Sequence, residues 1–183
     1  MAQKQIERVE HSASTRQDPE RDAEENSQYL TFRLNGELYA FGILKVKEIL
    51  EYGHVTRVPM MPDFMQGVIN LRGEVVPVIN LARRFEMKTQ EITKRTCVII
   101  VEVESDGQYQ DLGVMVDVVS EVLEIPESDM RNTPGFGARI RTDFIRSMGK
   151  LGEDFVIILD EDKVLSIDEL AMVSDMTNQL PAS

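Results

Sequence analysis

Apolar and polar residues alternate over two short runs and predict a β-hairpin. The runs Tyr29–Leu34 and Glu37–Phe41 place large side chains at every second position, which is the period of a half-buried strand. Asn35-Gly36 separates the runs and favours a two-residue type I′ turn, because both of its positions adopt positive φ angles. Such a turn sets the register. We therefore expect most large apolar groups to share one face, through the pairs Leu34 with Glu37, Phe32 with Tyr39 and Leu30 with Phe41.

Further apolar runs predict many short strands. These strands are expected at Val55–Val58, Val68–Leu71, Glu74–Leu81, Cys97–Val103, Asp111–Val118 and Phe155–Asp160. Pro77 has no N–H group to donate to a ladder, so an edge or a bulge is expected beside it. Short strands joined by turns rich in Gly and Pro, such as Asn132–Gly137, favour small barrels over a sheet with crossover helices.

Helical signals are short. Apolar residues three and four apart predict a helical turn within Ile43–Leu50, and a second turn is expected at Asp63–Gln66. Ser166 followed by Glu169 forms a capping box. The box predicts a C-terminal helix over Ser166–Met176.

The chain repeats itself at a distance. Residues Phe64–Asn80 match Phe144–Asp160 after a shift of 80 residues without a gap. Both copies hold an aromatic start, a Gly-containing turn with an acid, an apolar run and a closing Asn or Asp. A second echo links Val46–Glu51 with Val119–Glu124. The match is degenerate, but two echoes in the same order argue against chance and predict two fused β modules.

Composition narrows the classes of partner. The 183 residues carry a formal charge of −12, which disfavours nucleic acid and anionic lipid as partners. No run of 18 apolar residues is present, so no spanning helix and no direct membrane insertion are expected. Residues 1–27 are polar, lack an apolar signal core and are predicted to be a disordered tail. The single cysteine, Cys97, fits a reducing compartment.

Candidate catalytic groups are scarce. His11 lies in the tail, and His54 has no Cys or His near it at metal-ligand spacing. Cys97 begins an apolar strand and is interpreted as a core residue. Gly135-Phe136-Gly137 lacks the third glycine of a dinucleotide fingerprint. The sequence therefore predicts no enzyme activity, no metal and no cofactor.

Three residues remain as candidate contacts. Arg72, in the turn Asn70-Leu71-Arg72-Gly73, is either a solvated hairpin residue or a fork that pairs with a carboxylate on this chain or on a partner. Glu48 is either the polar side of a short helix or a contact. Phe136, in a loop with Pro and Gly, would make an interface anchor if exposed.

Several of these segments together resemble the CheW family of bacterial chemotaxis coupling proteins. The likeness rests on 39–48, 67–73, 75–81 and 112–117, and continues through Met130-Arg131, Pro134 and Phe136. It implies a mainly β fold of two intertwined five-stranded SH3-like barrels, with short helices and a C-terminal helix at about 166–176. The domain would span 28–173, with barrels at about 28–87 and 96–164.

The resemblance also implies a role. Members of the family are non-enzymatic adaptors that bind the regulatory domain of the histidine kinase CheA and the cytoplasmic tip of chemoreceptors. We therefore expect a cytoplasmic protein that is recruited to membrane-associated receptor arrays. Residues that match positions at the kinase-binding surface are Ile43, Glu48, Arg131 and Phe136. Those that match receptor-binding positions are Val46, Ile49, Gly67, Arg72, Cys97, Val98, Val119 and Val122. Cys97 stands where the family usually has Val.

Two alternatives stay open. Within the family, the chain could serve a pilus-motility or other non-flagellar chemosensory pathway. Outside it, a small β-barrel could bind an oligonucleotide or an oligosaccharide, although the chain has no Trp for stacking and its charge is adverse.

Overall fold

The computed structural model describes residues 27–105, 107–134 and 141–166. The predicted tail up to residue 26, Phe136 and the predicted C-terminal helix beyond Ser166 lie outside these ranges.

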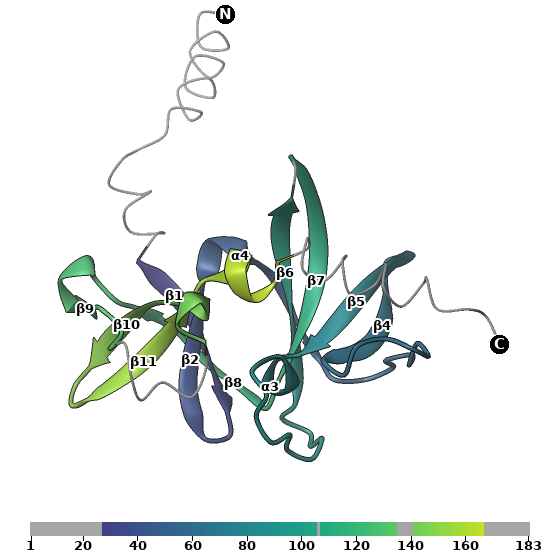
Figure 1. Cartoon of the computed structure of the whole chain (residues 1–183), viewed down its shortest axis with the longest axis horizontal. Helices are drawn as coiled ribbons and strands as arrows, with labels where there is room; N and C mark the ends of the chain where they lie inside the picture. The colour runs from purple at the N-terminus through teal and green to yellow at the C-terminus, as the bar shows by residue number, and fades with distance from the viewer. Residues whose placement is uncertain (1–26, 106, 135–140, 167–183) are drawn as a thin grey trace, which may run out of the picture.

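The described chain is mainly β and forms two sheets that lie side by side (Figure 1). One sheet has the order β8-β1-β2-β11-β10-β9 and the other has the order β3-β6-β7-β5-β4. The strands are β1 (Gln28–Leu34), β2 (Glu37–Gly42), β3 (Val46–Glu51), β4 (Met65–Leu71), β5 (Glu74–Asn80), β6 (Cys97–Ser105), β7 (Gln108–Val116), β8 (Val118–Glu124), β9 (Met130–Arg131), β10 (Ile145–Leu151) and β11 (Asp154–Leu159). The helices are η1 (Ile43–Lys45), α3 (Leu81–Arg84), η2 (Glu127–Asp129), η3 (Thr142–Phe144) and α4 (Glu161–Val164). The two SH3-like barrels of the prediction are confirmed, with the two-residue β9 as a sixth strand in one sheet.

The first hairpin confirms the predicted register pair by pair. Leu34 lies opposite Glu37, Phe32 opposite Tyr39 and Leu30 opposite Phe41. Asn35 and Gly36 have φ angles of 51° and 83°, as a type I′ turn requires. The large apolar side chains of both strands consequently enter one core.

Three apolar clusters fill the described part of the chain. The shared core lies between the two sheets and contains Leu30, Phe32, Leu34, Tyr39, Phe41, Ile79, Leu81, Ala82, Phe85, Ile99, Val101, Val103, Leu112, Val114, Val116, Phe144, Leu159, Val164 and Leu165. A second cluster, around Ala40 and Val156, comes from the opposite face of the β1–β2 sheet, and a third, around Val98 and Ile100, comes from the opposite face of the β6–β7 sheet. The central strands are buried on both faces, which is why Cys97–Val103 has a nearly continuous apolar sequence.

The 80-residue repeat is a structural repeat. Strands β4 and β5 and helix α3 recur at that shift as β10, β11 and α4. Each copy has a register shift after the first residue of its first strand. Each short helix begins after an Asn80 or Asp160 side chain that accepts a hydrogen bond from the backbone N–H three residues later. These two helices were missed by the sequence analysis, although the closing Asn and Asp were the signal for their N-caps.

The modules exchange strands. Sheet pairing joins β1 and β2 to β8–β11, whereas β3–β7 form the other sheet. The predicted barrel ranges of about 28–87 and 96–164 therefore do not match the sheets, which combine 28–42 with 118–159 on one side and hold 46–116 on the other. Strands β3 and β8 cross over because each leaves its own hairpin and pairs with the first strand of the other.

Some local predictions were wrong. The helical turn expected over Ile43–Leu50 stops at Lys45, and β3 follows with alternating burial. The strand expected at Val55–Val58 is reduced to one bridge between Thr56 and Val68. Asp63–Gln66 is a turn that leads directly into β4. Near Pro77 the prediction holds in part, since pairing of β5 with β7 is registered only from Val78 and the register of β4 shifts nearby.

One position separates the two copies chemically. Leu81 in the first copy corresponds to Glu161 in the second, and both are buried. A Glu161 carboxylate oxygen accepts a hydrogen bond from the Gly42 N–H at 2.6 Å, and Arg146 donates to the other oxygen at 3.2 Å. Burial raises the pKa of this carboxyl. Glu161 thereby links α4 to the crossover that leads from β2 to β3.

Candidate functional site

An apolar strip follows the boundary between the two sheets. We call it the seam, and it consists of Val46, Ile49, Cys97, Val119 and Val122. Val46 and Ile49 lie opposite Val101 and Ile99, while Val119 and Val122 lie opposite Phe32 and Leu30. Those four partners all belong to the shared core. Directly opposed residues point to the same face of a sheet, so the seam side chains face the side on which the two sheets meet.

Two matching β-bulges produce this arrangement. The register shifts by one residue between Val46 and Glu48 in the β3–β6 pair, and between Val119 and Val122 in the β8–β1 pair. Residues three apart on a regular strand point to opposite faces. The extra residue in each strand brings both apolar residues of its pair to one face.

Cys97 joins the two halves of the seam. It lies opposite Glu51 at the end of β3, and its thiol donates to the Arg95 carbonyl oxygen at 3.3 Å. The Val119 backbone at the start of β8 is close enough to lower the pKa of this thiol, against the larger effect of burial. Val46, Cys97 and Val119 pack against the shared core, whereas Ile49 and Val122 are 45% and 49% exposed. Burial raises the pKa of the Cys97 thiol, so less thiolate is present at neutral pH than in a free cysteine. The seam is thus an apolar strip with three partly buried residues and one exposed residue, Ile49 or Val122, on each of its two strands.

Glu48 and Arg72 form a bidentate ion pair. Arg72 Nη1 and Nη2 donate to the two Glu48 oxygens at 2.9 and 3.1 Å. Arg72 has a φ of 52° at the tip of the β4–β5 hairpin, and the Asn70 side chain accepts a hydrogen bond from the Gly73 N–H there. Of the two interpretations of Arg72, the structure supports the fork that pairs with a carboxylate on this chain.

Replacing Arg72 with alanine is expected to lower the free energy of unfolding by less than about 1 kcal/mol, because exposed pairs contribute little. The Arg72 side chain is 74% exposed. A double-mutant cycle with Glu48→Ala, measured by urea unfolding, isolates the pair. A coupling energy above about 2 kcal/mol would show that the pair is a structural element and not an available contact.

Three predicted contact residues are not freely exposed. Val98 is 2% exposed and belongs to the cluster inside the β3–β7 barrel, so its side chain does not line a surface. Gly67 is buried, and a Cβ placed on it would lie 2.2 Å from the Thr56 carbonyl oxygen. Ile43 packs against the shared core, and its neighbour Leu44 is the exposed residue of η1. Val98 and Gly67 are therefore packed inside the free protein, and a contact of either position with a partner stays a prediction.

The hairpin tips hold exposed apolar residues that the sequence analysis missed. Val75 is 74% exposed on β5, and its counterpart Phe155 is 47% exposed on β11. These hairpins lie at opposite ends of the molecule (Figure 1). Both residues are hidden within apolar runs, and only their equivalence in the 80-residue repeat could have singled them out. Arg131, on β9, is exposed and its guanidinium donates to the Ser128 and Met130 carbonyl oxygens.

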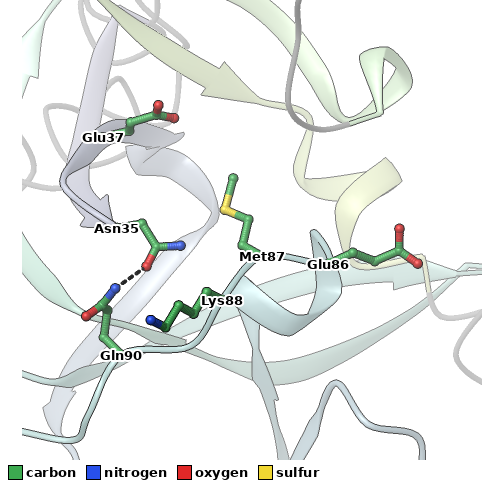
Figure 2. Close-up of a pocket in the computed structure, with 6 residues that line it drawn as sticks. All are labelled: Asn35, Glu37, Glu86, Met87, Lys88 and Gln90. Carbon is green, nitrogen blue, oxygen red and sulfur yellow. Dashed lines mark hydrogen bonds between the residues drawn. The ribbon is translucent and has the colours of Figure 1, made fainter.

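Two hollows of the described chain are lined by residues outside the seam. Figure 2 shows a hollow of about 400 Å³ between the β1–β2 turn and the segment after α3, where the Asn35 and Gln90 amides are hydrogen-bonded. A second hollow of about 310 Å³ lies beside the loop that precedes β4. No predicted site residue lines either one. Within the described ranges, the α-helices have four residues each, too few to cross a bilayer.

Comparison with known proteins gives one consistent family. The sequence model of the CheW-like domain matches residues 28–169. The chain is 38% identical over 149 residues to a chemotaxis protein CheW of Klebsiella aerogenes, covering 81% of this chain and 87% of that protein. The protein FrzA of Myxococcus xanthus is 31% identical over 112 residues, covering 61% and 68%.

A solved structure supports the same family. The scaffolding protein TtCheW of Thermoanaerobacter tengcongensis superposes with a TM-score of 0.67 at 34% identity, covering 74% of this chain and 84% of that one. The intertwined barrels, the duplicated hairpins and the family match lead to the same conclusion. This chain belongs to the family of CheW-like domains.

Proposed function

We propose that this protein is a non-enzymatic adaptor that couples chemoreceptors to a CheA-like histidine kinase. The observation that carries the proposal is the seam, an apolar strip with two exposed residues, Ile49 and Val122, on a chain of charge −12. Membership of the CheW-like family supports a chemotaxis role. The proposal places the protein in the cytoplasm, at receptor arrays.

The seam suits a helical segment of a receptor. Ile49 and Val122 project from two neighbouring edges, and an amphipathic helix lays its apolar stripe into such a strip. Glutamates border both strands, at Glu51 on β3 and at Glu121 and Glu124 on β8. An occupant with basic or uncharged residues beside its apolar stripe would complement this border.

The ends of the molecule suit the kinase. The proposed partner is a regulatory domain that is itself similar to CheW, and two such barrels can meet through equivalent hairpin surfaces. At one end, Val75 is an exposed apolar residue and lies on the same hairpin as Arg72 of the Glu48–Arg72 ion pair. At the other end, Phe155 is the exposed apolar residue. Two contact regions on one rigid body would couple the partners by geometry, with modest affinity at each and avidity from assembly.

A second candidate stays within the family. The match to the protein FrzA allows a role in a pilus-motility or other non-flagellar chemosensory pathway, while the matches to CheW proteins favour the first candidate. Deletion of the encoding gene separates the two, because loss of swimming chemotaxis with normal surface motility favours the first and the reverse favours the second.

Binding to both partners at once is the direct test of the proposal. The full chain, a purified receptor cytoplasmic fragment and a purified kinase regulatory domain are mixed and separated by size-exclusion chromatography. We expect a ternary peak that contains all three, and binary complexes when either partner is omitted. Binding of only one partner, or displacement of one by the other, would contradict an adaptor role.

A further inference from the structure

The two bulges that build the seam are fixed differently. In the β8 bulge, Ser120 and Glu121 lie against Thr31 of β1. The Thr31 hydroxyl donates to the Glu121 carbonyl oxygen at 2.7 Å and accepts from the Glu121 N–H at 3.1 Å. One buried hydroxyl thus satisfies both backbone groups that the bulge removes from the ladder.

The β3 bulge lacks such a hydroxyl. Ile100 lies there in the place of Thr31, and it is an ordinary member of the cluster inside its barrel. Glu48, the counterpart of Glu121, has its side chain held by Arg72. The position equivalent to Arg72 in the second copy is Gly152, which also has a positive φ, of 61°, but no side chain. The β3 bulge therefore forms over an aliphatic residue with Glu48 paired to Ile100, whereas Thr31 has no registered partner on β8 and contacts Glu121 through its hydroxyl.

We propose that Thr31 is a positioning residue for the seam, which holds the β8 bulge so that Val122 stays on the same face as Val119. Without the hydroxyl, the Glu121 backbone groups lose their partners and the bulge is free to slip along β8. A slip of one residue turns Val122 away from the seam and brings a glutamate towards it. This inference rests on the proposed function, because it makes Thr31 a determinant of receptor binding although Thr31 is buried and touches no partner.

Two substitutions separate the effect of the Thr31 hydroxyl from the effect of the side-chain volume. Thr31→Val keeps the volume and removes both hydrogen bonds, whereas Thr31→Ser keeps the hydroxyl. Ile158→Val is the matched control, since Ile158 lies inside the same barrel and next to Ala40, away from the bulge. Binding of each full-length variant to a purified chemoreceptor cytoplasmic fragment is measured, together with backbone amide hydrogen exchange.

Thr31→Val is expected to weaken fragment binding roughly fivefold, because the two lost hydrogen bonds each contribute a small net free energy and the bulge slips in only part of the molecules. The Glu121 amide should exchange faster in this variant, while Thr31→Ser and Ile158→Val should remain close to wild type in both measurements. Unchanged exchange at Glu121 in Thr31→Val, or equal weakening by Ile158→Val, would overturn the inference. If the wild-type chain fails to bind the fragment, the proposed function fails, and the exchange comparison still decides whether Thr31 holds the bulge.

Discussion

Replacing Gly67 with alanine is expected to lower the free energy of unfolding by about 2–5 kcal/mol, the sum of backbone strain and overpacking. Gly67 has a φ of 150°, and an added Cβ would lie 2.2 Å from the Thr56 carbonyl oxygen and 2.8 Å from the Val55 side chain. Thr56 and Val68 exchange two backbone hydrogen bonds at 2.9 Å beside it. The segment before β4 would have to move away, which breaks this bridge. Urea unfolding followed by circular dichroism measures the loss.

Gly73→Ala is the matched control on the same hairpin. Gly73 also has a positive φ, of 86°, but an added Cβ meets no atom within 4 Å. Its cost should be limited to about 1 kcal/mol of conformational strain. Equal losses for the two variants would show that the close approach at Gly67 does not matter. If Gly67→Ala alone loses stability, we expect any loss of partner binding in this variant to result from displacement of β4, because Gly67 offers no side chain to a partner.

Replacing Ile49 with glutamate is expected to weaken binding of a receptor cytoplasmic fragment about thirtyfold, the effect of removing a central hot spot. Ile49 is the exposed seam residue on β3, and a carboxylate there would be buried against the occupant without a partner. The fold should tolerate the change, since this side chain is already half in solvent. Isothermal titration calorimetry with the fragment, paired with thermal unfolding, measures both effects.

Ile92→Glu controls for charge and exposure. Ile92 is 52% exposed in the connector between α3 and β6 and is not one of the seam residues. This variant adds the same charge and removes the same side chain. Fragment binding equal to that of Ile49→Glu would mean that the seam is not the receptor surface.

Local pattern was sufficient where one residue type dictates one geometry. Asn35-Gly36 fixed the first hairpin to the residue, because its positive φ angles allow one register. The 80-residue repeat anticipated a structural duplication that extends to the bulges and the helix caps. The shorter echo of Val46–Glu51 and Val119–Glu124 marked the two crossover strands that form the seam.

Pattern failed where tertiary pairing decides. Val46–Leu50 has apolar residues three apart, which suggested a helix, but the spacing comes from a bulge that β6 imposes on a strand. Strand exchange between the modules was not visible in any short segment, so the barrel ranges were drawn along the chain instead of across it. The buried positions of Val98 and Gly67 likewise follow from long-range packing. The family resemblance named positions on particular strands without telling which of their side chains reach the surface.

Chemical labelling of Cys97 tests whether the seam is the receptor-binding surface, because the chain has a single cysteine and it lies in the seam. The rate of alkylation by a maleimide is measured for the free protein, with saturating receptor fragment, and with saturating kinase regulatory domain. Burial raises the pKa of this thiol, so labelling should be slow at neutral pH and faster as the pH rises. We expect the receptor fragment to slow alkylation of Cys97 at least about tenfold, because an occupant of the seam excludes the reagent. The kinase domain should change the alkylation rate little. A complex with the receptor fragment in which Cys97 is labelled at the free-protein rate would contradict a receptor site at the seam.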